Sequence, residues 1–228
     1  IVSNGAVIKD RTGVTLKRRV LGRDAAVRVL ELTAAWRDCA ALLFDRSHDV
    51  QLVFEHIDMA DESRRKFYEI NREAIAERPL HQCLDEDPVQ VMFSGPLGHM
   101  RALREVLVRR GRSLLSPDAA GKGGRSLFAV SITEYEQRDF ALVDVMAPGC
   151  SKGSAVADWA GSRGYLRSEV MAVGDNLNDL EMLEFAGVPI VMGNAASGLR
   201  LHANGWRFTG TNDEAGVAAA IRDYILTA

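Results

Sequence analysis

Apolar residues recur along the chain with two periods, and the alternation between them predicts a mixture of strands and helices. Short apolar runs predict strands at 50–55, 89–93, 127–132, 140–145, 170–173 and 188–192. Helical spacing predicts helices at 25–44, 62–75, 97–109, 151–160 and 180–186, the third ended by Gly111 and followed by a loop at 116–124. Residues 1–21 predict a strand from residue 1, a turn at 10–13 and a second strand. This order of elements indicates the α/β class.

One stretch near the C-terminal end has the clearest pattern. A strand at 170–173 breaks at Gly174, and four polar residues follow within five positions. A helical pattern comes next, and Gly187 ends it before the strand at 188–192. Strand, helix and strand form a βαβ unit, which builds a parallel sheet. Because open parallel sheets bind ligands just beyond the carboxyl ends of their strands, we expect a binding site at the polar stretch.

The polar residues of this stretch suit a divalent cation and a phosphate. Asp175 and Asp179 lie about one helical turn apart, so their carboxylates converge on one side. Such oxygen ligands suit Mg²⁺, which usually binds one or two protein carboxylates together with water and substrate phosphate. Asn178 can donate a hydrogen bond to phosphate without adding negative charge, and a helix N-terminus favours anions. The alternative is that these residues only cap the helix, although one of the four would suffice for that.

A lysine at the start of a predicted helix adds to this picture. Lys152 follows Pro148 and Gly149 and opens the helix at 151–160. A cation is electrostatically unfavourable at a helix N-terminus, because the helix dipole attracts anions there. An anion held in front of the helix would explain the lysine. The alternative is an exposed lysine with no ligand.

A family resemblance rests on these residues and on three further segments. The sequence GDNLNDLEML at 174–183 resembles the fourth signature of the haloacid dehalogenase-like superfamily, and more closely that of its Cof-like sugar-phosphatase branch. APGCSKGSAV at 147–156 is similar to the third signature, which carries a lysine. VSNGAVI at 2–8 and NDEAGVAAAI at 212–221 are similar to a core strand with its NGA turn and to the C-terminal end.

The resemblance implies a particular domain organisation. Members of the superfamily have a Rossmann-like core with a parallel sheet, and this branch inserts an α/β cap after the third core strand. We therefore expect residues 1–20 and 147–228 to form two segments of the core. Residues 21–146, with their alternating helices and strands, would form the cap.

The resemblance also implies an activity and roles for five residues. It implies Mg²⁺-dependent hydrolysis of small phosphorylated metabolites, such as sugar phosphates, through an aspartyl-phosphate. Asp175 and Asp179 would bind the Mg²⁺, with Asp179 also catalytic. Lys152 would be catalytic, bridging the phosphate and the nucleophilic carboxylate, and Asn178 would bind substrate. Asn4 would lie near the active site and contact substrate, although Asn-Gly is equally typical of a simple turn.

In the family, the nucleophilic Asp and the phosphate-binding Ser or Thr precede the NGA turn. Neither motif occurs in this sequence, which begins at Ile1 inside a predicted strand. We therefore expect an N-terminally truncated chain that is inactive alone. Residues 85–87 have DxD spacing, but Pro and Val follow instead of Gly and Thr, so they predict a solvated loop.

Composition sets the remaining bounds. Apolar residues make up 47% of the chain and charged residues 26%, which predicts a globular protein with a core. The net charge of −3 gives no reason to expect nucleic acid as a partner, and no apolar run is long enough to span a membrane. Three cysteines without CxxC spacing predict a reducing, cytoplasmic setting. The oligomeric state stays open.

Two alternatives to hydrolysis remain at this point. The first is a phosphate-binding or regulatory protein that lacks the nucleophile. The second is a phosphomutase or phosphotransferase of the same superfamily, which passes the phosphoryl group to an alcohol rather than to water.

Overall fold

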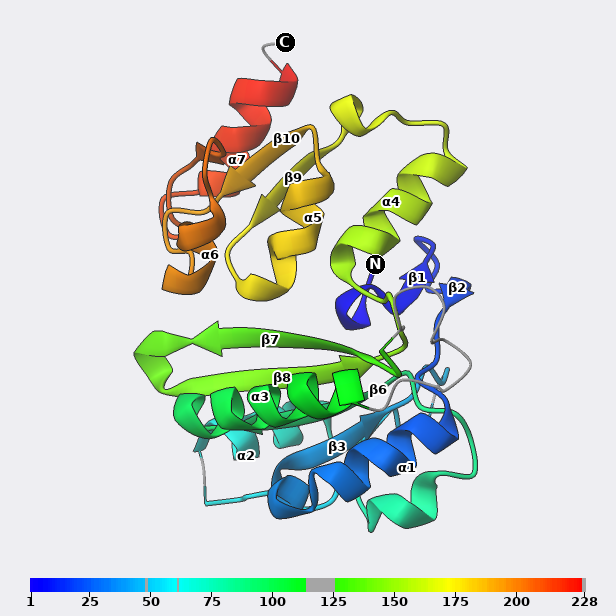
Figure 1. Ribbon diagram of the computed structural model, residues 1–228. Helices are drawn as coiled ribbons and strands as arrows, with labels where there is room; N and C mark the ends of the chain where they lie inside the picture. The colour runs from blue at the N-terminus through cyan, green and yellow to red at the C-terminus, as the bar shows by residue number, and fades with distance from the viewer. Residues whose placement is uncertain (48, 61, 114–125, 227–228) are drawn as a thin grey trace.

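The computed structural model describes residues 1–47, 49–60, 62–113 and 126–226. Within these ranges the strands form a two-stranded hairpin, a three-stranded sheet and a six-stranded sheet. Figure 1 shows the three-stranded sheet above the six-stranded sheet, with the hairpin to one side between them. The predicted loop at 116–124 lies outside the described residues.

The six-stranded sheet has the strand order β5-β4-β3-β6-β8-β7. Its strands are β3 (Ala40–Leu43), β4 (Leu52–Phe54), β5 (Ile75–Glu77), β6 (Gln90–Gly95), β7 (Ala129–Tyr135) and β8 (Phe140–Met146). Neighbouring strands are antiparallel except for β4 and β5. Helices α1 (Arg23–Leu32) and α3 (Leu97–Ser113) cover one face, which we call the helix face. Helix α2 (Glu62–Asn71) packs on part of the opposite face, which we call the open face.

Alternation along the strands explains the two faces. Leu42, Phe93 and Val143 are fully buried with Leu30 of α1 and Leu107 of α3 in one apolar cluster. Successive side chains of a strand point to opposite faces, so the residues between these positions belong to the open face. The open face is therefore the part of this sheet that is available for polar contacts with the rest of the chain.

The three-stranded sheet is parallel, with the order β11-β10-β9. Its strands are β9 (Met171–Gly174), β10 (Val188–Val191) and β11 (Arg207–Phe208). Helix α5 (Leu180–Phe185) connects β9 to β10, and α6 (Ser197–His202) packs against the same apolar cluster. The remaining helices of this part are α4 (Lys152–Ser162), which packs against α5, and α7 (Gly216–Ile221). The predicted βαβ unit and the α/β class are confirmed.

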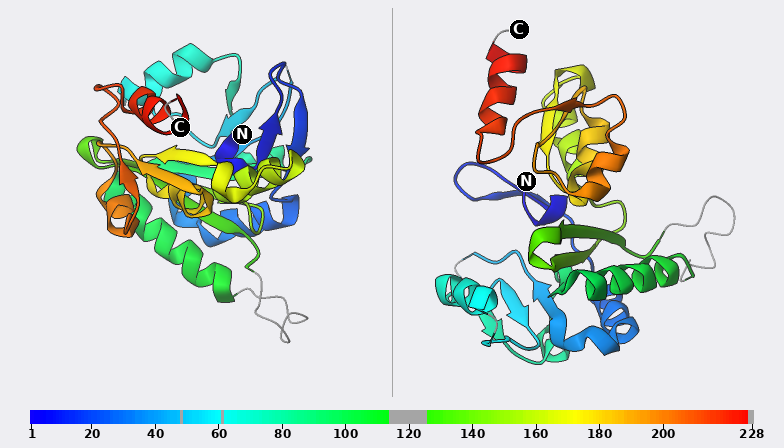
Figure 2. Two further views of the ribbon diagram at one scale, coloured as in Figure 1. Left: turned by 90° about the horizontal axis from the view of Figure 1, so that it is seen from above. Right: turned by 90° about the vertical axis from the view of Figure 1, so that its left-hand side faces the viewer.

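The six-stranded sheet lies between two chain segments, because β1 (Val7–Lys9) and β2 (Thr15–Arg18) precede it and α4 follows it. A mixed α/β unit is thus inserted before the parallel sheet, as predicted. Figure 2 shows the two sheets as separate layers, with the hairpin and α4 beside the gap between the ribbons. The domain boundaries at residues 20 and 146 stay a prediction.

The predicted strand from residue 1 is wrong. Val2 makes one isolated bridge with Val7, and residues Ser3–Gly5 form a single 3-10 turn, η1. Ser3 and Asn4 have positive φ angles of 51° and 49°. Asn tolerates this left-handed region better than most residues, so the Asn-Gly pair turns the chain where the apolar pattern alone predicted extension.

Three predicted helix ends are also wrong. The helix predicted at 25–44 ends at Leu32, and β3 occupies its last part; the helix predicted at 62–75 is followed by β5. A short buried strand shows no alternation, so its apolar run cannot be told from a helix by period alone. Helix α3 continues past Gly111, because this glycine allows Phe128 to approach: a Cβ there would lie 3.0 Å from the ring.

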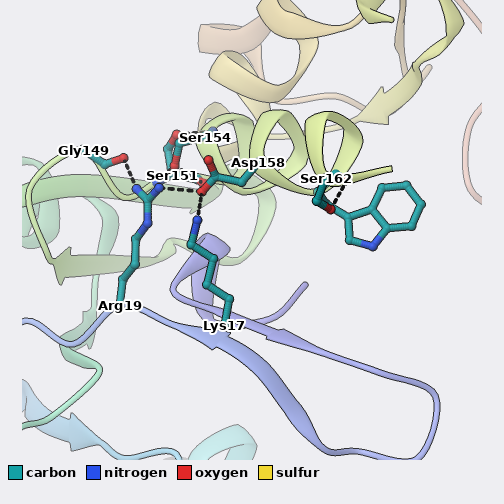
Figure 3. A network of polar contacts seen from close by, with 8 residues as sticks. Lys17, Arg19, Gly149, Ser151, Ser154, Asp158 and Ser162 are labelled. Carbon is teal, nitrogen blue, oxygen red and sulfur yellow. Dashed lines mark hydrogen bonds and ion pairs between the residues drawn. The ribbon is translucent and has the colours of Figure 1, made fainter. Parts of the chain in front are cut away.

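The hairpin holds helix α4 in place through an ion-pair network (Figure 3). Lys17 Nζ lies 2.6 Å and Arg19 Nη2 lies 2.5 Å from Asp158 Oδ2 on α4. Arg19 also donates to the Gly149 carbonyl oxygen at 3.0 Å, just before the helix. These contacts tie both ends of the inserted unit to the element that carries Lys152.

Two glycines permit close approaches around α4. Gly5 has a φ of +96°, and a Cβ on it would lie 2.1 Å from the Ser151 carbonyl oxygen. A Cβ on Gly153 would lie 2.5 Å from backbone atoms of Glu181 in α5. Real Cβ atoms do not come this close to backbone atoms, so both positions require glycine if the turn, α4 and α5 are to meet.

The remaining observations on the fold concern membrane-spanning helices and the three cysteines. Over the described ranges, no helix combines the length and the apolar character needed to cross a membrane. Cys39, Cys83 and Cys150 form no disulfide in the part of the chain that the structure describes. Burial raises the pKa of Cys150 to about 11, so this thiol stays protonated and packs as a small apolar side chain.

We expect Gly153→Ala to destabilise the protein and Gly161→Ala on the same helix to leave it unharmed. The added methyl at 153 pushes α4 from α5, which typically costs about 1–3 kcal/mol. At 161 a Cβ meets no atom within 4 Å, so the better helix propensity of alanine should stabilise by up to about 1 kcal/mol. Urea unfolding of both variants measures the difference, and equal stabilities would contradict the close approach.

Candidate active site

The turn after β9 is built around one buried carboxylate. Asp179 Oδ2 accepts hydrogen bonds from the backbone N–H groups of Asp175 at 3.0 Å and Asn176 at 3.2 Å. Asp179 Oδ1 accepts from Lys152 Nζ at 2.5 Å. A carboxylate that is only 5% exposed needs such partners, because burying a charge without them is costly. Asp179 therefore fixes both the end of β9 and the position of the lysine.

Asp175 lies beside this pair with its carboxyl toward the same space. The residue as a whole is exposed, yet partial burial of its carboxyl raises the pKa above the ordinary value. The negative charge of Asp179 adds to that rise, and the charge of Lys152 opposes it. The cluster thus holds more negative charge than one lysine compensates.

A second set of contacts links the turn to the six-stranded sheet. Asn178 Nδ2 donates to Asn4 Oδ1 at 3.0 Å, and Asn4 Nδ2 donates to Asp144 Oδ2 at 2.7 Å. Gln90 Nε2 donates to Asp144 Oδ1 at 2.9 Å. Asp144 on β8 and Gln90 on β6 both project from the open face of the sheet. The Asn-Gly turn is therefore a bridge between the two sheets, rather than a simple connection.

Asp144 was not among the residues predicted from the sequence. It is a single acidic residue within the apolar strand 140–146, and that interruption was the available signal. Burial raises the pKa of Asp144 to about 7, although the hydrogen bond from Asn4 and the charge of Lys152 both act to lower it. With 3% exposure, this carboxyl changes its protonation state near neutral pH inside the protein.

Asn176 makes a further contact between the two sheets. Its Oδ1 accepts from the Glu134 N–H at 2.9 Å, and its Nδ2 donates to the Glu134 carbonyl oxygen at 2.7 Å. Glu134 belongs to β7, and its carboxylate pairs with Arg101 of α3. The side-chain amide of Asn176 thus pairs with the backbone of β7 as another strand would. No local sequence pattern predicts this role.

Two buried acceptors in this region have no hydrogen-bond partner. Over the described residues, they are Asn178 Oδ1 and Gln90 Oε1; a third buried atom without a partner, Trp36 Nε1, lies on η2 (Ala34–Cys39) in the inserted unit. An acceptor that is buried and unpaired costs free energy. Both acceptors suit a ligand that brings donors, such as hydroxyl groups or metal-bound water.

The donor set fits a divalent cation with few protein ligands. In the described part of the chain, no group of three or more His, Cys, Asp or Glu residues is placed to hold a metal ion. Mg²⁺ commonly binds one or two carboxylates and completes its shell with water and substrate phosphate. Burial and, second to it, the charge of Asp179 raise the pKa of Asp175, so a nearby cation would favour its ionised form. Both oxygens of Asp179 already accept hydrogen bonds, so Asp175 is the better candidate ligand, and Asp179 as a ligand stays a prediction.

The structure therefore brings the five predicted site residues together. Asn4, Asn178, Asp179 and Lys152 are connected by hydrogen bonds directly or through the turn, and Asp175 lies within electrostatic reach of Lys152. All lie at the carboxyl end of β9, where a parallel sheet binds its ligands. Their chemical roles stay predictions. The DxD segment at 85–87 lies elsewhere, and Asp87 accepts from the Arg23 N–H that opens α1.

Comparisons with known proteins agree with this arrangement. The family model of haloacid dehalogenase-like hydrolases matches residues 1–221. The chain is 40% identical over 84 residues to the 5-amino-6-(5-phospho-D-ribitylamino)uracil phosphatase YcsE of Bacillus subtilis (37% of this chain, 33% of that protein). It is 42% identical over 62 residues to the pyridoxal phosphate phosphatase YbhA of Escherichia coli (27% and 23%). The matched segment thus spans a third or less of these relatives.

Solved structures show the same fold. A haloacid dehalogenase-like hydrolase from B. subtilis superposes with a TM-score of 0.72 at 18% identity, covering 98% of this chain and 78% of that one. A haloacid dehalogenase-like hydrolase from Bacteroides thetaiotaomicron gives a TM-score of 0.64 at 24% identity, with 96% and 74% covered. At these identities the likeness concerns the fold alone.

We expect the buried carboxyl of Asp144 to make the protein less stable as the pH rises. Its folded pKa lies above its unfolded value of 3.8, so the folded state binds more protons between about pH 4 and 7. Unfolding free energy should therefore fall across that window, by on the order of 4 kcal/mol, and level off above it. Asp144→Asn, which stays neutral, should remove this slope in melting curves recorded from pH 5 to 8.

Asp45→Asn is the matched control for this measurement. Burial of Asp45 opposes ionisation, but the contacts with Lys9 and Thr15 lower its pKa overall. Its stabilising contribution is lost only as the pH falls through that lowered pKa, so it is constant from pH 5 to 8. The slope in Asp45→Asn should match the parent protein. An unchanged slope in Asp144→Asn would show that Asp144 is not the responsible group.

Proposed function

The chain belongs to the haloacid dehalogenase-like hydrolase family, and we propose that it is part of a Mg²⁺-dependent phosphatase. The proposed substrates are small phosphorylated metabolites, such as sugar phosphates. The observation that carries the proposal is the Lys152–Asp179 pair, fixed beside Asp175 and Asn178 at the carboxyl end of β9. We propose in addition that residues 21–146 act as the cap, with 1–20 and 147–228 as the core.

Lys152 is proposed to bind the phosphate. Its ammonium group has three N–H donors, and the contact with Asp179 uses one of them. Asp179 holds the lysine at one end of the site, so its charge is already in place when the phosphate arrives. Asn178 adds a neutral donor from the same turn, and Asn4 keeps that amide oriented through the 3.0 Å hydrogen bond.

Asp175 is proposed as the protein ligand of Mg²⁺. When bound, the ion would neutralise phosphoryl oxygen charge and polarise the group for attack. Burial and the neighbouring charge of Asp179 raise the pKa of Asp175, and a bound cation would offset both effects. The phosphate carries about two negative charges, so Lys152 alone would balance only half of them.

The proposed reaction transfers the phosphoryl group twice. An aspartate carboxylate attacks phosphorus, a P–O bond to aspartate forms, and the P–O bond to the alcohol breaks. A neighbouring acid protonates the leaving oxygen and then, as a base, takes a proton from the water that releases phosphate. The residues described here have binding and charge-neutralising roles in this scheme. We propose that the nucleophile and the acid lie outside this sequence, as the family resemblance implies, so that these 228 residues are inactive alone.

The relatives support a small phosphorylated substrate. The two curated proteins reported above are named as phosphatases of a phosphorylated ribitylaminouracil and of pyridoxal phosphate. We propose a cytoplasmic protein without a nucleic-acid partner, supported by three cysteines that lack CxxC spacing and form no described disulfide, and by a net charge of −3.

We expect Asp175→Asn in the full-length protein to abolish Mg²⁺-dependent phosphate release while raising the melting temperature. The variant loses the metal ligand, which should lower kcat by at least about 10²-fold. The ionised carboxylate of Asp175 is disfavoured in the folded state, as its raised pKa shows, so the neutral amide should stabilise the fold at pH 7. A colorimetric phosphate assay over a panel of esters, with thermal melts in metal-free buffer, measures both effects.

Asp213→Asn removes an exposed carboxylate far along the chain from this site and serves as the matched control. It should keep both activity and melting temperature. Full activity in Asp175→Asn would refute the metal-ligand role. Phosphate binding without release by the unaltered full-length protein would indicate the non-catalytic alternative, and release only when an acceptor alcohol is added would indicate a phosphotransferase.

A further inference from the structure

A cavity of about 400 Å³ opens on the open face of the six-stranded sheet, beside α2. Its floor is formed by Met92 of β6 and Leu142 of β8. Phe140, the first residue of β8, also lines it. Two aromatic residues of α2, Phe67 and Tyr68, form the wall across from it. The cavity has not been used in the function proposed so far.

The strand register places the cavity beside the polar network on the same sheet face. Met92 on β6 pairs directly with Asp144 on β8, and Cβ atoms of such partners lie about 5 Å apart. Leu142 lies two residues from Asp144 along β8, about 6.7 Å away on the same face. Asp144 in turn binds Asn4 at 2.7 Å, and Asn4 binds Asn178. A molecule whose phosphate reaches Lys152 and Asn178 thus has this cavity within reach of its other end.

The lining of the cavity determines what it can bind. Four aromatic rings and three aliphatic side chains surround it; the rings are Phe54, Phe67, Tyr68 and Phe140, and the aliphatic ones are Ile57, Met92 and Leu142. The polar lining residues Asp38, His56, Arg138 and Asp139 are exposed and lie at the rim, whereas Asp58 is half-buried and Ser94 is buried. Flat apolar groups gain both from leaving water and from contacts with aromatic rings.

We infer that this cavity binds the leaving group of the phosphate ester, and that this group is a planar aromatic or heteroaromatic ring on a short arm. The inference rests on the proposed phosphatase function and narrows its substrate class. A sugar or another polyol would place several hydroxyl groups against an apolar wall, and each hydroxyl without a partner would weaken binding. The donors and acceptors around Asp144 and Gln90 lie at the phosphate side, where an arm or a single ring substituent would reach them.

The kinetic test compares benzyl phosphate with glucose 6-phosphate on the full-length protein with Mg²⁺. We expect a KM for benzyl phosphate that is about tenfold lower or better. Phe140→Leu, which keeps an apolar side chain but removes the ring, should raise that KM several-fold, leave kcat within about twofold, and not change the KM for glucose 6-phosphate. Phe208→Leu, on the edge strand β11 of the other sheet, is the matched control and should change neither. Equal KM values for the two esters, or an unaffected Phe140→Leu, would overturn the inference.

A binding test separates failure of the inference from failure of the proposed function. Pyridoxine and sorbitol, neither of which carries a phosphate, are titrated while the Met92 methyl signal is followed by NMR. Pyridoxine should shift this signal and sorbitol should not, and Leu142→Trp, which fills the cavity with a larger apolar side chain, should abolish the shift. This result supports the cavity even if no ester is hydrolysed, in which case only the phosphatase proposal fails. No shift with pyridoxine, in a protein that hydrolyses phosphate esters, overturns the cavity proposal alone.

Discussion

The carboxylate of Asp179 is the contact on which the rest of the site depends. It is almost fully buried and is compensated by one ammonium group, that of Lys152, and by two backbone N–H groups of the turn after β9. Removing the Lys152 ammonium would leave the buried carboxylate with two neutral donors only, so this contact holds the end of β9 and the start of α4 together. The bare backbone of Gly153 lets α4 come close enough for this contact. The contact that compensates this charge also places the Lys152 ammonium where the proposed phosphate would bind.

The side-chain amides of Asn4 and Asn176 connect the turn after β9 to the six-stranded sheet. Asn4 joins Asn178 to Asp144, and Asn176 pairs with the backbone of Glu134. Both contacts are partly or wholly buried, where hydrogen bonds are geometrically demanding and costly to leave unmade. They therefore fix the position of the open face relative to the phosphate end of the site. A carboxyl on that face, protonated near neutral pH, completes the link at little electrostatic cost.

In the proposed function, recognition is divided between two chemically different ends of the site. The end near Lys152 is charged and rigid, and it suits any phosphate ester because the phosphate group is common to all of them. The end near Leu142 and Phe140 is apolar and lies on the inserted unit. On this proposal, selectivity between esters comes from the second end, since the first cannot distinguish one alcohol from another. Strands β6 and β8 carry residues of both the polar network and the apolar cavity. The six-stranded sheet would therefore set the distance between the phosphate and the leaving group.

Local sequence was sufficient to locate the phosphate end. The strand before Gly174, the acidic and amide residues after it, and Lys152 at a helix start are short-range patterns whose chemistry does not depend on the rest of the chain. The same reasoning failed at β3, since a short strand that is buried on both faces has no period of its own. It also failed at residues 1–6, where the left-handed Asn4 turns the chain.

Only the tertiary structure decided which distant residues complete the site. Asp144 and Asn4 are 140 positions apart, and Asn176 and Glu134 are 42 apart. No local pattern indicates such pairs, because they form only when the turn after β9 and the turn at Ser3–Gly5 pack against the six-stranded sheet. The sequence thus determined the chemical groups that follow β9 and begin α4. The packing decided that a buried acid, a bridging amide and an aromatic cavity would stand opposite them, because burial and cross-sheet contact arise from the whole chain together.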